Sequence, residues 1–553
     1  MSNKLKTTAY LALIGLLLLP LFAYSVSDNS ILTVAEASNY TQTSRYQDVI
    51  KFIKKLQQQT KWLRIETICT SAEGRAVPLL IIGQPVPSSP QELKYDKRAV
   101  IYIEANIHAG EVEGKEASLM IARDIVLKEP PPYLNQLIIL MAPIFNADGN
   151  EKIDPAHRRN QLGPEKGVGV RYNGQNLDLN RDSMKLESYE LKGLVKNVLQ
   201  RWDPLLLVDC HTTNGSYHQE PVTYSWPLNP NGDLTIINYM RDTMLPAISQ
   251  RLKEKYNTLS IPYGNFVEFR SPEKGWRTFS HLPRFLTNYL GLRNRLSILD
   301  ENYAYADFKT RVLACYNFLR SILDYCSEHR DEIVKLTAEA DRRAIKQGLN
   351  PNSQYTFGVE FETKPLPQKV TIQGWETEII PRKQGWPQLK KTERKRTFVL
   401  PYFAEFVAKR SVPLPYAYLI PIYDVKIERK LIQHGLLVEK LTEPASLEVE
   451  GFRLKEIKGT SSLYQGHRLN SVKGEYFKEN KEFSPGTLFI TTAQPLGHLA
   501  PYLLEPESDD GLLVWNFFDR YLVSQWRQQP QVYPVYKLMH PVNIAKEKIE
   551  EKI

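Results

Sequence analysis

The sequence has few cysteines for its length. Its 553 residues include four, which stand far apart at Cys69, Cys210, Cys315 and Cys326. Structural zinc sites need close pairs of cysteines, and four in so long a chain do not make a disulfide scaffold. We therefore expect hydrophobic cores to hold the fold together. We also expect Cys210 to be a buried strand residue rather than a nucleophile.

The sequence also lacks any long stretch of residues with charge of one sign. The formal net charge is +9, but acidic residues alternate with basic ones nearly everywhere. No basic run is interleaved with aromatic side chains, as surfaces that bind nucleic acids require. The sequence therefore predicts no nucleic-acid partner. Hydrophobic residues make up 42% and charged residues 24% of the chain, which is typical of a folded globular protein.

A long uncharged apolar run occurs only near the N-terminus. Lys4 and Lys6 precede an apolar segment from about residue 9 to 26. This layout predicts a secretory signal peptide over residues 1–25, with cleavage after residue 37 as an alternative. A segment of this length nearly suffices to span a bilayer, which takes about 20 residues, so an uncleaved anchor stays open. We expect a secreted, periplasmic or cell-envelope protein that touches a membrane only if this segment is uncleaved.

Residues 40–335 show the pattern of an α/β domain. Short, mostly apolar runs such as 99–107 and 137–145 predict strands that are buried on both faces. Between them, residues 113–128 place apolar side chains at helical spacing. The sequence predicts a mixed, mostly parallel sheet with helices on both faces. A long Gly/Asn/Pro-rich loop at 161–175 is of the kind that often borders a site.

The pattern changes after about residue 336. Short β-rich runs appear, separated by Gly, Pro and Asn, and predict a second, mainly β domain at 340–540. A second domain is also expected because one core stops growing at about 250–300 residues. We expect helices near 425–433 and 511–522. The charged run 389–396 predicts a solvated loop.

Polar side chains stand where the predicted strands end. His108 follows one strand, His211 follows another, and Glu301 closes a third. Ligands of open α/β sheets bind beyond the carboxyl ends of strands. Glu111 lies three residues after His108, a spacing that lets both side chains reach one Zn²⁺ ion, and catalytic zinc takes three protein ligands.

That spacing alone does not decide the matter. His108 could instead be a core histidine that is hydrogen-bonded locally. Other candidate ligands lie nearby in the sequence; they are Glu113, Glu116, His218 and Glu220.

Seven short motifs occur in a characteristic order over about residues 46–330. They are CTSAEGR (69–75), IHAGEVEGKEA (107–117), FNADG (145–149), HRRN (157–160), NLDLNRD (176–182), DCHTT (209–213) and ILDENYAY (298–305). In order and approximate spacing this region resembles the zinc carboxypeptidase family. The resemblance implies that His108, Glu111 and His211 hold one Zn²⁺ ion. It also implies that Glu301 takes a proton from the attacking water and passes it to the leaving amine.

The resemblance assigns the substrate contacts as well. Arg158, or its neighbour Arg159, would stabilise the developing oxyanion. Asn180 and Arg181 would bind the free C-terminal carboxylate of a peptide substrate, with a structural ion pair between Arg181 and Asp178 or Asp182 as the alternative. Gly110 stands where the family often has arginine, so a cation beside the metal is expected to be missing. The substrate-capping tyrosine stays open among four candidates, which are Tyr263, Tyr289, Tyr303 and Tyr305.

Together these observations predict a zinc-dependent metallocarboxypeptidase. It would hydrolyse the C-terminal amide bond of peptides by a promoted-water route. One alternative is a zinc amidohydrolase, deacylase or envelope-peptide hydrolase on the same scaffold. Another is a non-catalytic envelope-binding protein that keeps the fold.

Overall fold

The structure is a computed structural model, and it describes residues 31–128, 131–213, 215–351, 355–380, 388–522 and 531–549. Leu32–Ile553 form one compact unit, separate from Met1–Ile31. The expected signal peptide at 1–25 lies outside the described residues. Within the described ranges, no helix combines the length and apolar character that crossing a membrane requires.

An eight-stranded mixed sheet forms the centre of the first half of the chain. Its strands follow the order β1-β2-β4-β3-β5-β10-β6-β7. Their bounds are Leu63–Thr70 (β1), Ala76–Ile82 (β2), Ala99–Ala105 (β3), Leu137–Ala142 (β4), Leu206–Thr213 (β5), Val222–Ser225 (β6), Ser260–Pro262 (β7) and Leu296–Tyr303 (β10). The four middle strands β4, β3, β5 and β10 run parallel. Their carboxyl ends therefore meet at one edge.

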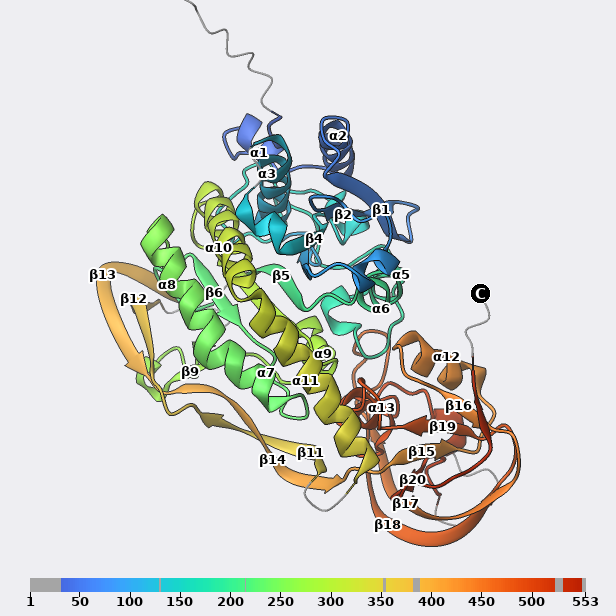
Figure 1. Cartoon of the computed structure of the whole chain (residues 1–553). Coiled ribbons are helices and arrows are strands. Elements are labelled where there is room, and N and C mark those ends of the chain that lie inside the picture. The colour runs from blue at the N-terminus through green and yellow to red at the C-terminus, as the bar shows by residue number, and fades with distance from the viewer. Residues whose placement is uncertain are drawn as a thin grey trace, which may run out of the picture. The chain divides into compact units, whose positions relative to one another are not determined.

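Helices cover both faces of this sheet, as the apolar strands require. On one face lie α3 (Glu113–Leu127) and α10 (Phe308–Glu328) (Figure 1). Gly114 of α3 sits so close to the sheet that a Cβ there would lie 2.4 Å from the Cβ of Cys210. On the other face, α9 (Leu286–Leu292) packs its apolar side chains into the core that contains Leu207 of β5. The predicted α/β fold class is confirmed.

Two long antiparallel strand pairs follow the helix α11 (Arg330–Leu349), which extends the helical region further than the sequence predicted. One pair, β11 (Thr356–Pro365) and β14 (Tyr402–Pro413), joins β9 (Trp276–Arg277) and β8 (Asn265–Phe266) in a four-stranded sheet. The other consists of β12 (Val370–Ile380) and β13 (Gln388–Leu400). The prediction of a loop at 389–396 is wrong, because these residues lie in β13. Their charges stay exposed on the hairpin.

The rest of the β-rich region is built around a seven-stranded sheet. Its order is β18-β17-β20-β15-β19-β16-β21. The bounds are Ala417–Ile420 (β15), Glu439–Leu441 (β16), Ala445–Gly459 (β17), Asn470–Phe483 (β18), Leu488–Thr491 (β19), Tyr536–Leu538 (β20) and Lys546–Lys548 (β21). The helix expected at 425–433 is α12 (Val425–Gln433), whereas at 511–522 only α14 (Asp519–Leu522) is helical. One hydrophobic core joins this region to the central sheet.

Candidate active site

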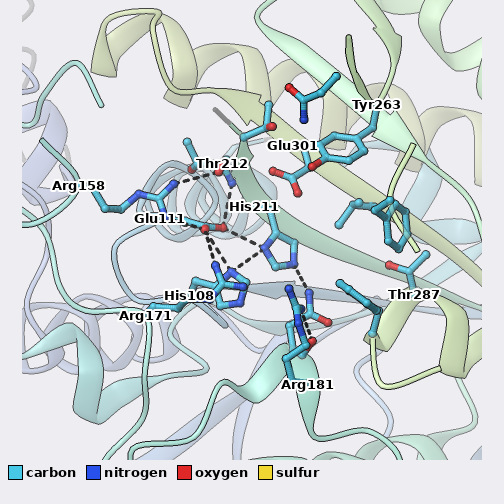
Figure 2. A pocket seen from close by; sticks show the side chains of 16 residues that line it. His108, Glu111, Arg158, Arg171, Arg181, His211, Thr212, Tyr263, Thr287 and Glu301 are labelled. Atoms are coloured by element: carbon cyan, nitrogen blue, oxygen red, sulfur yellow. Dashed lines mark hydrogen bonds and ion pairs between the residues drawn. The ribbon is translucent and has the colours of Figure 1, made fainter. Parts of the chain in front are cut away.

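A cavity of about 350 Å³ opens at the carboxyl ends of the central strands. Its wall includes every side chain to which the sequence assigned a role. They are His108, Glu111, Arg158, Asn180, Arg181, His211 and Glu301. Figure 2 shows these side chains around one space, although they come from segments far apart in the chain.

Three side chains converge as a possible metal-binding group. The Nδ1 atom of His211 lies 2.9 Å from Glu111 Oε2 and 3.2 Å from His108 Nδ1. His108 Nδ1 in turn lies 3.1 Å from Glu111 Oε1. Ligands at about 2.0–2.2 Å from a tetrahedral zinc ion lie roughly 3.3 Å from one another. The two nitrogens and the carboxylate therefore fit a zinc ion in kind and in spacing.

The backbone after β3 explains how His108 and Glu111 meet. Asn106 has φ = 67° and turns the chain sharply at the strand end. The Glu111 N–H donates to His108 O at 2.9 Å, and Asn106 Nδ2 donates to Glu111 O at 3.1 Å. This closed turn directs the imidazole and the carboxylate to the same side just before α3 begins.

A carboxylate faces the outer nitrogen of each histidine. Asp178 Oδ1 lies 3.0 Å from His108 Nε2, and Asp209 Oδ2 lies 2.8 Å from His211 Nε2. The hydrogen bond from His108 Nε2 to Asp178 holds that ring in the tautomer that leaves Nδ1 free to bind a metal. Burial alone would raise the pKa of Asp178, but His108 and Arg171 outweigh it and hold that pKa well below its usual range. Asp178 is therefore a permanent acceptor for the ring.

Glu301 lies beside this group on β10. It pairs with His211 of β5 on one side and with Thr223 of β6 on the other. Its carboxylate points into the cavity (Figure 2). Burial raises the pKa of Glu301 to about 8, with the charge of Glu111 adding to this and His211 opposing it. A carboxyl group with a raised pKa is suited to accept and return a proton near neutral pH.

Arg158, and not Arg159, lines the cavity. Its guanidinium donates to Glu111 Oε1 at 2.8 Å and to Thr212 O at 3.0 Å. Arg159 is exposed and donates to Ala156 O instead. The stem of Arg158 also explains Gly110, because a Cβ at that position would lie 2.6 Å from Arg158 Cδ.

Arg171 is a cavity residue that the sequence prediction missed. It donates to Asp178 Oδ2 at 2.6 Å, and its guanidinium lies 3.8 Å from Glu111 Oε1. A cation therefore does stand beside the metal-binding group, contrary to what Gly110 led us to expect. Its position in the loop 161–175, which the sequence marked as bordering a site, is the signal that could have found it.

Asn180 and Arg181 lie on the short helix Leu179–Arg181. Asn180 Nδ2 lies 3.1 Å from His211 Nε2, and its Oδ1 accepts from Leu286 N at 2.9 Å. The Arg181 guanidinium lies 4.0 Å from the centre of the Phe285 ring. Arg171 pairs with Asp178 and Lys185 pairs with Asp182, so Arg181 forms the suggested ion pair with neither of these carboxylates.

Among the four candidate tyrosines, Tyr263 lines the cavity (Figure 2). Tyr289 is buried and its hydroxyl lies 2.8 Å from His434 Nδ1. The Tyr303 ring lies 4.0 Å from that of His218. The Tyr305 ring lies 5.0 Å from that of Tyr217, so Tyr263 is the candidate that lines this cavity.

The competing ligand candidates have other partners. Glu113 pairs with Arg311, Glu116 accepts from Thr43 and Ser44, and Glu220 accepts from the backbone of Gln373. Cys210 is buried and faces away from the cavity, beside Asp300 and Cys315. It is the buried strand residue that we predicted.

Comparison with known proteins agrees with this geometry. Residues 49–203 match the sequence profile described as zinc carboxypeptidase. This segment is therefore similar to the zinc carboxypeptidase family. The matched segment includes His108, Glu111, Arg158, Asn180 and Arg181, and His211 and Glu301 lie beyond it. A comparison with curated proteins finds no match.

Solved carboxypeptidase structures also resemble the chain. A metallo-carboxypeptidase from Burkholderia cenocepacia is 14% identical over 51% of this chain and 69% of its own, with a TM-score of 0.38. A metallo-carboxypeptidase from Pseudomonas aeruginosa, in complex with (2-guanidinoethylmercapto)succinic acid, is 16% identical over 52% and 69%, with a TM-score of 0.36. Carboxypeptidase A from Helicoverpa armigera is 15% identical over 55% and 75%, with a TM-score of 0.37.

Proposed function

We propose that the protein is a zinc-dependent metallocarboxypeptidase that removes C-terminal residues from peptides. The observation that carries this proposal is the convergence of His108, Glu111 and His211 in the cavity that also holds Glu301. The family match supports the same chemistry. One Zn²⁺ ion would be held by the two Nδ1 atoms and the Glu111 carboxylate.

A zinc ion bound there would supply Lewis-acid polarisation of a water molecule and of the scissile carbonyl. Glu301 would accept a proton from the attacking water and return it to the leaving nitrogen. Both transfers need a carboxylate within hydrogen-bond reach of the reacting atoms, and Glu301 projects into the cavity from β10. Arg158 would donate to the oxyanion that develops on the carbonyl oxygen, a contact worth about 2.7–4 kcal/mol in other enzymes.

The specificity for a free carboxylate would come from Arg181. Its side chain lies over Phe285, and a guanidinium binds carboxylate at two points. Asn180 would act by positioning, because its amide already contacts His211 and the start of α9. Tyr263 would cover the substrate on the other side of His211.

The proposal is tested with one peptide and its C-terminally amidated form. We expect the zinc-loaded protein to release the last residue from the free acid only, and a chelator to abolish the release. Equal turnover of the two forms would favour an amidohydrolase or deacylase on this scaffold. No turnover of any peptide, with zinc bound, would favour the non-catalytic alternative.

We also propose that the protein is exported through the segment 1–25. The apolar run and the preceding lysines support this. N-terminal sequencing of protein recovered from the cell envelope or the medium tests it. A start near residue 26 or 38 would fit cleavage, and an intact N-terminus would favour a membrane anchor.

A further inference from the structure

A second cavity of about 350 Å³ adjoins the candidate active site. It lies between the hairpin β12–β13 and the segment that follows β5. Aromatic side chains form much of its wall; they are Tyr217, Phe266, Phe269, Trp375 and Phe398. Phe269 is 42% exposed. An exposed aromatic surface inside a cavity is typical of a binding site.

The two cavities share one partition. Asn265 lines the first cavity and the next residue, Phe266, lines the second. Asn265 Oδ1 accepts from Ser216 N at 3.1 Å, and Ser216 lines the second cavity. Gly215 allows this contact, because a Cβ there would lie 2.1 Å from Asn265 Oδ1. The second cavity therefore lies directly beside the first, with Asn265 at the boundary between them.

The hairpin is fixed to the strand-end segment rather than free to move. Gln219 N donates to Gln373 O at 2.7 Å, and Gln373 N donates to Glu220 Oε1 at 2.7 Å. The rings of Phe398 and Phe266 meet edge to face with their centres 5.1 Å apart. The aromatic wall is thus held in place before any ligand binds, which lowers the entropic cost of binding.

The rim of the second cavity is positively charged. Arg270 and Arg396 line it, and Lys391 Nζ lies 4.3 Å from the centre of the Trp375 ring. The acidic lining residue Glu376 is paired with Arg394 at 2.6 Å. A carboxylate beside an aromatic side chain would match this combination of charge and apolar wall.

The position of the second cavity relative to the active site determines which part of a peptide substrate it can bind. Figure 2 shows Arg181 on one side of His211, and Thr212 and Tyr263 on the other. If Arg181 binds the C-terminal carboxylate of the substrate, the residue after the cut bond lies on the same side of His211 as Arg181. The upstream part of the peptide would then lie on the side of Thr212, and residues 215–217, which come shortly after it in the chain, line the second cavity.

Resting on the proposed function, we infer that the second cavity is a subsite for the substrate upstream of the cut bond. This subsite binds an aromatic side chain of the peptide whose neighbouring residue in the peptide is acidic. The strands β12 and β13, which form one wall, lie outside the segment that matches the family profile. This subsite therefore belongs to the accessory hairpin of this chain.

The test compares a blocked dipeptide with blocked pentapeptides that share its C-terminal residue. Phenylalanine, with glutamate beside it, is placed in turn at each upstream position, and alanine is the reference. For the zinc-loaded full chain we expect kcat/KM at one position to be about tenfold higher with Phe-Glu than with Ala-Ala. Cleavage of the dipeptide without any such preference would overturn the subsite and leave the carboxypeptidase standing. If no peptide is cleaved, both proposals fail.

Two variants test whether the second cavity causes this preference for phenylalanine and glutamate. Trp375→Ala should bring the ratio of kcat/KM between the phenylalanine peptide and the alanine peptide to near one. Arg396→Gln should reduce the share of the preference that glutamate contributes. Val399→Ala is the matched control, because Val399 is exposed on β13 next to Phe398 and does not line the cavity. Unchanged ratios in folded, zinc-loaded Trp375→Ala and Arg396→Gln proteins would overturn the assignment.

Discussion

Glu301 and His211 lie directly opposite each other on the parallel strands β10 and β5. The ladder of backbone hydrogen bonds between these strands fixes the distance between the candidate proton acceptor and the metal-binding group. A constellation held on neighbouring strands keeps its geometry better than one held on loops. The chemistry proposed here therefore needs no movement of these two residues.

Replacing Glu301 by glutamine should lower kcat at least about a hundredfold, or ~2.7 kcal/mol. Glutamine keeps the shape but cannot accept the proton from water. Zinc content should not change, because Glu301 is outside the group of three ligands. Steady-state kinetics and metal analysis measure both. Glu268→Gln, an exposed residue paired with Lys274, is the control, and a Glu301→Gln variant as active as that control would contradict the mechanism.

The central fold and the metal-binding group could be predicted because their patterns are local. β3 and β5 are apolar on both faces, and His108 and His211 stand at or near their ends. Asp209 could also have been found, since it lies two residues before His211 and so faces the same side of the strand. The order of the seven motifs then indicated which strand ends meet.

Other features could not be predicted because they depend on distant contacts. β13 is exposed along most of its length, so its charged sequence has no alternation to mark a strand. Arg171 reaches Glu111 only because the loop 161–175 folds back over the strand ends. The role of the hairpin β12–β13 in a second cavity depends on its docking against residues 218–220.

The carboxylates behind the histidines should affect metal affinity more than catalysis. In Asp178→Asn, the amide can still contact His108 but no longer supplies a negative charge. We expect zinc affinity to fall about 10- to 100-fold, while kcat at saturating zinc changes less. Competition with a chromogenic chelator measures the affinity. Asp324→Asn, at a surface ion pair with Lys255, serves for comparison. Equal affinity of the two variants would show that Asp178 does not support the metal ligand.

A methyl group at position 110 should disturb the oxyanion donor. In Gly110→Ala the new Cβ would lie 2.6 Å from Arg158 Cδ and 3.0 Å from Gly169 O. Arg158 must then shift from its contact with Thr212 O. We expect kcat to fall about tenfold or more, since an oxyanion donor is worth ~2.7–4 kcal/mol when lost completely. Zinc content and melting temperature identify any general damage. Unaltered kcat in the folded variant would argue against Arg158 as that donor.

The contact between His467 and Glu187 should make stability depend on pH. His467 Nε2 lies 3.0 Å from Glu187 Oε1, and Nδ1 lies 3.0 Å from Asn516 Oδ1. The hydrogen bond to Glu187 raises the pKa of His467. Burial would raise the pKa of Glu187, but His467 and Lys185 lower it to about 2.

Because the pKa of His467 is raised in the folded protein, its protonation contributes fully to stability below the ordinary pKa of 6.5. That contribution is lost as the pH rises through the raised pKa. Because the pKa of Glu187 is lowered, its ionisation contributes to stability above the ordinary pKa of 4.5, and that contribution is lost as the pH falls toward about 2. Both terms are present between these ordinary values. A double-mutant cycle with His467→Gln and Glu187→Gln should therefore give a coupling of about 0.5–1 kcal/mol at pH 5.5, because the pair is partly exposed. The coupling should shrink at pH 9, where Glu187 keeps only Lys185. A coupling in denaturant unfolding that is equal at both pH values would contradict the expected loss of the His467 charge between them.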